Sequence, residues 1–477
     1  MAQEQLDART RRVLPWLVAV GFFMQTLDAT ILNTALPAMA EALGESPLRM
    51  QAVVVAYMLT VALLIPASGY LSDRFGARRV FLSAIVLFCV GSLACASSKT
   101  LPQLVAARVI QGMGGAMLLP VGRLAILKAF PKSELLGVLS FVTIPGLIGP
   151  LVGPALGGVL VETLSWHWVF LINLPVGVVG AIATRFFMPE LREKTQGFDW
   201  LGFLLFGLGM LAVSFALQGM GEHALSMASS LVLLAAGLAS MAAYWLHSGR
   251  QTRPLFSKQL LRIHSFAVGV AGNLFARLGS GAMPFLTPLF LQVGLGYSPT
   301  EAGLFMVPTV LGAMLSKVFV ERLVQRLGYR RVLVGNTLLL GLLMMSYARL
   351  DASASVVTLV LQLAAFGVVN SLQFSAMNTL TLADLEGETA SSGNSLLSVV
   401  MQLSMSLGVA AGAALLEAFA PQHVGEVGEV GSPAVLWAFQ RTYLCVGLLS
   451  MMASLIFLQL AHEDGANLRR RVAGPID

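Results

Sequence analysis

Fourteen long apolar segments are the feature that most constrains the fold of this chain. A helix needs roughly 20 mostly apolar residues to cross a bilayer, and such segments follow one another along the 477 residues. Inside a membrane the backbone must satisfy its own hydrogen bonds, which favours helices. The sequence therefore predicts an all-α polytopic membrane protein with spans at 14–36, 51–72, 80–97, 101–123, 136–161, 166–188, 199–220, 225–247, 264–293, 299–320, 331–349, 355–380, 391–418 and 436–460.

The composition supports a membrane setting and argues against other classes. Charged residues make up 11% of the chain, against about a quarter in soluble domains. The lipid bilayer is therefore the expected surrounding, and the net charge of +6 is not taken as a nucleic-acid signal. Cys89, Cys95 and Cys445 lie in apolar segments, which predicts neither a disulfide framework nor a metal site. No nucleotide-binding loop or catalytic motif is present, so we expect no enzyme, no cofactor and no use of ATP.

The distribution of basic residues predicts the orientation of the chain. With the N-terminus inside, most arginines and lysines fall in cytoplasmic loops, as at Arg78, Arg79, Arg330 and Arg331. Such a bias is the positive-inside rule. One internal loop is acidic, at 384–388, but acidic residues contribute little to orientation. Both termini are therefore predicted to be cytoplasmic.

An internal repeat predicts how the spans are grouped. The string GYLSDRFGARRV at Gly69–Val80 recurs as ERLVQRLGYRRV at Glu321–Val332. The spacing leaves room for two helices between two parallel six-helix repeats, a known transporter plan. We expect a six-helix bundle at 1–190, two inserted helices with cytoplasmic linkers at 191–262, and a second six-helix bundle at 263–477.

The first copy of this repeat resembles the signature loop of the major facilitator superfamily. The resemblance implies a conformational latch formed by Gly69, Asp73, Arg74, Gly76 and Arg78. In that family the aspartate lies near the N-terminus of a helix of the other half, where the helix dipole favours a carboxylate. Here that helix is the thirteenth span, with Ser391 or Ser392 as the expected N-cap. In the second copy, glutamine replaces the aspartate, so only the first copy is expected to form the full latch.

The fourth span contains LVAARVIQGMGGA at Leu104–Ala116. Arg108, Gln111, Gly112 and Gly115 share one helical face by their spacing. An arginine within a membrane helix must face a cavity or a partner. The string resembles the superfamily's fourth-span motif, whose arginine is implicated in proton transfer. The alternative is an arginine that bonds carbonyl groups and fixes helix packing.

The fifth span contains GLIGPLVGPALGG. Its glycines leave a smooth face for close helix contact, and its prolines remove backbone hydrogen bonds and bend the helix. The string resembles the superfamily's antiporter motif, which is found mainly in exporters. The motif residues are Gly146, Gly149, Pro150, Gly153, Pro154, Gly157 and Gly158.

Two further strings narrow the resemblance to the fourteen-helix drug:proton antiporters. They are LDATILNTALP at Leu27–Pro37 and WHWVFLINLPVG at Trp166–Gly177, where His167 replaces a common arginine and is expected to be interfacial. The resemblance covers nearly the whole chain. It implies a monomeric multi-pass protein of a bacterial inner membrane that exports drugs or metabolites by alternating access, driven by the proton gradient.

Asp28 is the candidate proton carrier, because it is the only carboxylate well inside a span of the N-terminal half. Burial favours the neutral form of a carboxyl group and a nearby arginine favours the charged form. We therefore assign Arg108 as the modulator of Asp28; the alternative is a permanent structural ion pair. Gln25 and Asn33 lie on nearby helical positions and are predicted to line the cavity.

The remaining predicted cavity residues are Gln111, Asn273, Arg277 and Gln373. Arg277 lies midway along the ninth span and is a candidate anion-binding group; alternatively it pairs with Asp28 or packs against carbonyl groups. One aspartate against two arginines favours a neutral, zwitterionic or anionic substrate over a dication. An exporter specific for an organic anion such as a carboxylate, a passive facilitator, a sensor that does not transport, and an importer are the competing functions.

Overall fold

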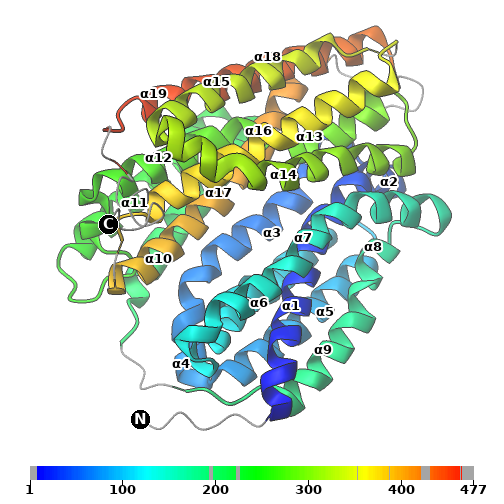
Figure 1. The fold of residues 1–477 in the computed structure, drawn as a ribbon. Coiled ribbons are helices and arrows are strands. Elements are labelled where there is room, and N and C mark those ends of the chain that lie inside the picture. The colour runs from blue at the N-terminus through cyan, green and yellow to red at the C-terminus, as the bar shows by residue number, and fades with distance from the viewer. Residues whose placement is uncertain are drawn as a thin grey trace. The chain divides into compact units, whose positions relative to one another are not determined.

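The computed structural model describes residues 8–192, 197–221, 226–351, 353–385, 387–420, 430–461 and 464, and its regular elements there are all helical (Figure 1). Fourteen of the described helices are long and apolar enough to cross a membrane. Each overlaps one predicted span, so the predicted number of spans is confirmed. Many large apolar side chains on these helices are exposed, among them Phe186, Val232 and Val318, as expected for surfaces that face lipid.

The chain divides into two compact units. Unit 1 comprises 1–198 with 298–304, and unit 2 comprises 199–297 with 305–477. The helices of unit 1 are α1 (Ala8–Ile31), η1 (Leu32–Thr34), α2 (Leu36–Leu43), α3 (Gln51–Leu64), η2 (Ile65–Ala67), α4 (Ser68–Phe75), α5 (Ala77–Ala96), α6 (Leu101–Ala129), α7 (Lys132–Thr163), α8 (Trp168–Leu171) and α9 (Asn173–Phe187).

Unit 2 contains the remaining helices and most of α14, whose first turn belongs to unit 1. Its elements are α10 (Trp200–Gly221), α11 (Met227–Ser248), η3 (Lys258–Arg262), α12 (His264–Ser280), α13 (Met283–Leu289), the π-helical turn η4 (Phe290–Gly294), α14 (Pro299–Leu327), α15 (Tyr329–Ser346), η5 (Tyr347–Arg349), α16 (Val356–Leu382), α17 (Gly387–Phe419), α18 (Pro433–Met452) and α19 (Ser454–Phe457).

Local sequence explains several helix ends. Thr100 caps α6 by accepting a hydrogen bond from the backbone N–H of Gln103, and Pro102 follows in the first turn, where its missing N–H does no harm. Ser226, Ser355 and Ser432 cap α11, α16 and α18 in the same way. Gly76 separates α4 from α5 with φ +92°, a conformation that favours glycine.

The two helices α10 and α11 pack on each other, and α10 also packs on α17. The Asp199 carboxylate ties the two ends of this hairpin together. It accepts hydrogen bonds from the backbone N–H groups of Gly202 (2.9 Å) and Leu255 (3.2 Å), and its Oδ1 lies 2.7 Å from Nε2 of His247. Asp199, which precedes α10, is thus bound to His247 at the end of α11 and to Leu255 after it.

The structure corrects one helix start and refines three spans. The helix of the thirteenth span begins at Gly387, so Ser391 and Ser392 lie inside α17 and the predicted N-cap is wrong; the polar residues before them continue the helix. The ninth span breaks near Gly281 into α12 and α13. The helices α6 and α14 extend past the predicted ends into basic turns at Lys128 and Arg326, because a helix can leave the hydrocarbon layer without ending.

Candidate functional site

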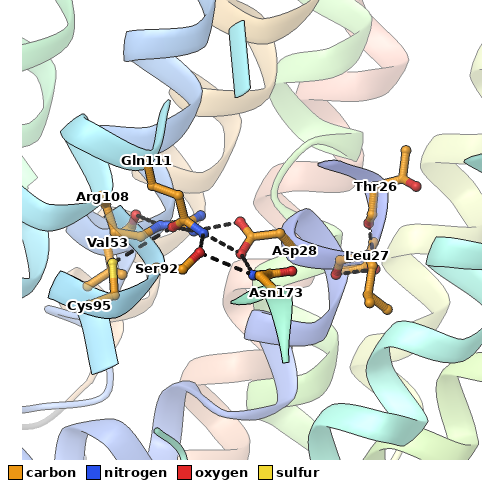
Figure 2. A network of polar contacts seen from close by, with 10 residues as sticks. Thr26, Leu27, Asp28, Val53, Ser92, Cys95, Arg108, Gln111 and Asn173 are labelled. Atoms are coloured by element: carbon orange, nitrogen blue, oxygen red, sulfur yellow. Dashed lines mark hydrogen bonds and ion pairs between the residues drawn. The ribbon is translucent and has the colours of Figure 1, made fainter. Parts of the chain in front are cut away.

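The centre of unit 1 holds a buried ion pair between α1 and α6. Arg108 Nη1 donates to Asp28 Oδ2 at 2.7 Å, and both residues are 1% exposed. Figure 2 shows the two side chains facing each other within a larger polar network. The structure therefore brings together the two residues to which the sequence assigned proton coupling.

Two neutral side chains complete the hydrogen bonding of the Asp28 carboxylate. Gln111 Nε2 donates to Asp28 Oδ1 at 2.7 Å, and Asn173 Nδ2 donates to the same oxygen at 3.0 Å. The Ser92 hydroxyl oxygen accepts from both amides, at 2.9 Å and 3.4 Å. With Arg108, the carboxylate accepts three hydrogen bonds, so both of its oxygen atoms have donors.

Arg108 has partners besides Asp28. Its Nε donates to the backbone oxygen of Val53 at 3.2 Å, and its Nη1 donates to Gln111 Oε1 at 2.6 Å. Its guanidinium carbon lies 4.3 Å from the centre of the Tyr57 ring, within the range of a cation–π contact. The guanidinium group would thus keep several contacts if the carboxylate became neutral.

Small residues and a helix break let the polar side chains meet. A side chain at Gly91 of α5 would overlap the backbone of Gln111 on α6, so only glycine permits this approach. Pro175 has no N–H to offer the carbonyl of Leu171, where α8 ends; this missing bond explains the break. The break places Asn173 at the first position of α9, beside Asp28.

The glycine motif of the fifth span lies against the helix that carries Asp28. A Cβ at Gly149 would lie 2.8 Å from the backbone nitrogen of Leu27, and one at Gly153 would lie 3.1 Å from that of Ile31. A Cβ at Gly146 would overlap the Phe22 side chain, and one at Gly157 would overlap the Ile31 backbone. The hydroxyl group of Thr34 donates to the carbonyl of Pro154 at 3.1 Å. The α7 helix therefore approaches α1 backbone to backbone.

The predicted latch loop has partners within unit 1 that the sequence did not indicate. Lys128 Nζ lies 2.7 Å from Asp73 Oδ1, and Arg78 Nη2 lies 3.2 Å from Glu190 Oε2. A Cβ at Gly76 would overlap the Glu190 carboxylate, whereas one at Gly69 would meet no atom within 4 Å. No described residue of unit 1 therefore approaches Gly69 closely. The contact of Asp73 with the thirteenth span, which belongs to unit 2, stays a prediction.

Unit 2 holds a buried arginine in a different setting. Arg277 is 1% exposed; its Nε donates to Asn273 Oδ1 at 3.0 Å and its Nη2 to Asn378 Oδ1 at 3.4 Å. Its guanidinium carbon lies 3.3 Å from the Phe374 ring centre. Within the described part of the chain, Nη1 has no hydrogen-bond partner, and no carboxylate pairs with this arginine.

The other predicted cavity residues take different positions. Gln111 is fully buried in the network around Asp28 rather than apart from it. Gln373 connects α16 to α15, since it donates to Thr337 Oγ1 at 2.8 Å and accepts from Asn336 Nδ2 at 2.9 Å. Gln25 and Asn33 form no hydrogen bond to Asp28 among the described residues, and the side-chain oxygen of Gln25 is buried without a partner there.

Sequence reasoning missed Asn173, Ser92 and Tyr57. Asn173 could have been predicted, because it lies in the sixth-span string WHWVFLINLPVG, two residues before Pro175. Ser92 and Tyr57 carry no such signal, since hydroxyl groups are frequent in membrane helices. The described residues include no group of three or more His, Cys, Asp or Glu side chains that could hold a metal.

The fold and this intramembrane polar site define a polytopic membrane transporter, and the chain belongs to the Major Facilitator Superfamily. The family model matches residues 18–409 and 269–473. Two solved structures have the same fold: a D-xylose-proton symporter (TM-score 0.65, 14% identity, 95% of this chain and 99% of that one) and a POT family transporter in complex with 5-aminolevulinic acid (0.70, 15%, 96% of each chain). Membership in this family confirms a transporter rather than an enzyme.

Much more similar relatives carry the name "Putative multidrug resistance protein MdtD". The chain is 51% identical to the protein of Serratia proteamaculans over 452 residues, covering 95% of this chain and 94% of the relative. It is 52% identical to that of Citrobacter koseri over 456 residues (95% of each), and 51% identical to that of Salmonella heidelberg over 464 residues (97% and 98%).

Proposed function

We propose that this chain is a proton-coupled antiporter that exports small organic molecules across the bacterial inner membrane, with Asp28 as the proton carrier. The observation that carries the proposal is the Asp28–Arg108 pair, which is fully buried and lies 2.7 Å apart within unit 1. Charged groups inside a membrane segment are expensive and are functional-site candidates by default. Relatives named for multidrug resistance support the substrate class of small organic molecules.

Protonation of Asp28 would release Arg108. A neutral carboxyl group no longer attracts the guanidinium group, and its proton needs an acceptor where Arg108 Nη1 now donates. Arg108 keeps Val53, Gln111 and the Tyr57 ring as partners, so the release leaves no bare buried charge. Arg108 therefore has alternative partners for a second arrangement of the pair, which a coupling element requires.

The α7 helix would transmit this change. Its glycines bring its backbone against α1 beside Asp28, so a shift of α1 must be followed by α7. Alternating access by rocking of two six-helix bundles around a midplane site is the general plan for such transporters. In this cycle the loop of Gly69, Asp73, Arg74, Gly76 and Arg78 acts as the latch, protons enter from outside, and substrate leaves as protons move inward. The protein acts as a monomer and needs no cofactor.

Inside-out vesicles test the proposal. Collapse of an imposed pH gradient is followed while lipophilic cations, neutral drugs and organic anions are added singly. We expect at least one compound to collapse the gradient with native protein and not with Asp28→Asn. Equal activity of native protein and Asp28→Asn would show that Asp28 is structural. A native protein that moves a compound without affecting the gradient would be a passive facilitator. A native protein that responds to no compound in the panel would favour a sensor that does not transport.

A second candidate function, export specific for an organic anion such as a carboxylate, rests on Arg277. Its guanidinium group is buried, has no acidic partner among the described residues, and has one unoccupied donor at Nη1. Arginine binds carboxylates with two parallel hydrogen bonds, and an unpaired buried charge is costly. A substrate carboxylate would supply the missing partner, and the Phe374 ring would hold the guanidinium group in place.

The same vesicles separate the two candidates. Arg277→Gln should abolish the response to organic anions such as carboxylates while responses to neutral compounds remain. Gln373→Leu is the matched control, because Gln373 is buried in the same unit but already has its partners. Unchanged anion responses in Arg277→Gln would reduce Arg277 to a packing residue.

A further inference from the structure

We propose that Asn173 is a positioning residue of the proton site, which holds the Asp28 carboxylate in its charged form and links it to the break in the sixth span. The inference rests on the proposed role of Asp28 as proton carrier. It explains why the WHWVFLINLPVG string contains an amide two residues before a proline.

The geometry singles out Asn173 among the neighbours of Asp28. It is 2% exposed, and its Nδ2 donates to Asp28 Oδ1 at 3.0 Å and to Ser92 Oγ at 3.4 Å. Gln111 also donates to Oδ1, but its side chain is tied to Arg108 and cannot act independently of the ion pair. Asn173 is therefore the one described donor to Asp28 that comes from outside α6.

The helix break makes this contact sensitive to protonation. Asn173 begins α9 immediately after the turn at Ile172, where α8 ends. Ile172 keeps helical dihedral angles (φ −58°, ψ −25°), but Pro175 cannot donate to the carbonyl of Leu171, so this turn has one backbone hydrogen bond fewer than a helix interior. When Asp28 binds a proton, it accepts less strongly, and the start of α9 loses its buried anchor.

The charged and titratable groups around Asp28 are few. They are Arg108 from α6, Tyr57 from α3 and Cys95 from α5. The neighbouring stretch of α7, residues 145–155, and the first turns of α9 carry no titratable side chain. A change at Asn173 should therefore act on the protonation of Asp28 itself rather than through another titrating group.

Infrared spectroscopy of the full-length protein in liposomes tests the proposal without a substrate. The carbonyl band of protonated carboxyl groups is followed as a function of pH, and the component lost in Asp28→Asn is assigned to Asp28. A hydrogen bond to a charged group is worth about 1.5–3 kcal/mol. In Asn173→Leu, we therefore expect the Asp28 component to reach half its intensity roughly one to two pH units higher than in native protein.

Two further variants keep the test decisive. Asn173→Asp places a second carboxyl group beside Asp28, and two such groups share a proton, so this variant should hold its proton to still higher pH. Thr60→Val is the control, because Thr60 is a buried polar residue of the same unit whose hydroxyl group donates to the carbonyl of Ala56 rather than to Asp28; it should titrate like native protein.

The outcomes separate this inference from the proposed function. If Asn173→Leu and Asn173→Asp both fold and titrate like native protein, Asn173 is only a packing residue. If the Asp28→Asn spectrum equals the native one at every pH from about 4 to about 10, a range that includes strongly shifted carboxyl groups, Asp28 takes up no proton and the carrier role itself is wrong.

Discussion

Removal of Arg108 should destabilise the protein through the carboxylate that it leaves behind. In Arg108→Gln, Asp28 loses its only described ion-pair partner and remains 1% exposed. Breaking a buried pair by removing one partner costs about 3–5 kcal/mol. At roughly 2–4 °C per kcal/mol for a unit of about 200 residues, the midpoint of thermal unfolding should fall by about 10 °C.

The double variant Arg108→Gln/Asp28→Asn identifies the cause of this loss. Without a buried charge, two amides can hydrogen-bond to each other and to Gln111, so most of the lost stability should return. The loss in Arg108→Gln should also be larger at alkaline than at acid pH, because at acid pH the isolated carboxylate can take up a proton and become neutral. Thermal unfolding in detergent, followed by size-exclusion fluorescence, measures both effects.

The control for this prediction is Arg123→Gln on the same helix, since Arg123 is exposed and its loss should change the midpoint little. If Arg108→Gln unfolds at the native temperature, the ion pair contributes nothing to stability. If the double variant is as unstable as the single one, Arg108 matters through its contacts with Val53 and Tyr57 rather than through charge.

Three smaller predictions follow from helix contacts. Gly149→Val should abolish transport and lower stability, because its Cβ would lie 2.8 Å from a backbone nitrogen of α1; Gly137→Ala, with no atom within 4 Å, should leave both unchanged. Gly76→Ala should lower the free energy of unfolding by about 1–2 kcal/mol, because alanine is strained at a φ of +92°. The added methyl group should also push the Glu190 carboxylate away from the loop, which would lower the yield of a cysteine crosslink between the two segments. Gln373→Leu should change the unfolding midpoint by little, since an interhelical hydrogen bond in a membrane is worth about 0.6 kcal/mol.

The spans could be predicted because a bilayer sets one length for every helix that crosses it. Asp28 and Arg108 could be predicted as partners for a related reason. A charge in an apolar span needs a counter-charge, and the N-terminal half has few to choose from. The same reasoning left the partner of Arg277 open, with Asp28 as one alternative, and among the described residues Arg277 contacts asparagine side chains instead.

The rest of the site depends on which helices are neighbours, and a single sequence does not specify this. Gln111 was placed in a substrate cavity because its helical face was known but the helix opposite was not. Asn173 joins Asp28 from 145 residues away along the chain. The start of α17 was misplaced because a serine followed by apolar residues resembles an N-cap even when the helix has already begun.

The carboxylate of Asp199 has a consequence for the architecture of the chain. Because it accepts hydrogen bonds from the backbone N–H groups of Gly202 and Leu255, the chain enters and leaves the hairpin at nearly one point. A segment with adjoining ends can be gained or lost without separating the sequences on either side, as in tolerated domain insertions. The α10–α11 hairpin is thus attached through adjoining ends, and its removal would leave only a short gap between residues 199 and 255.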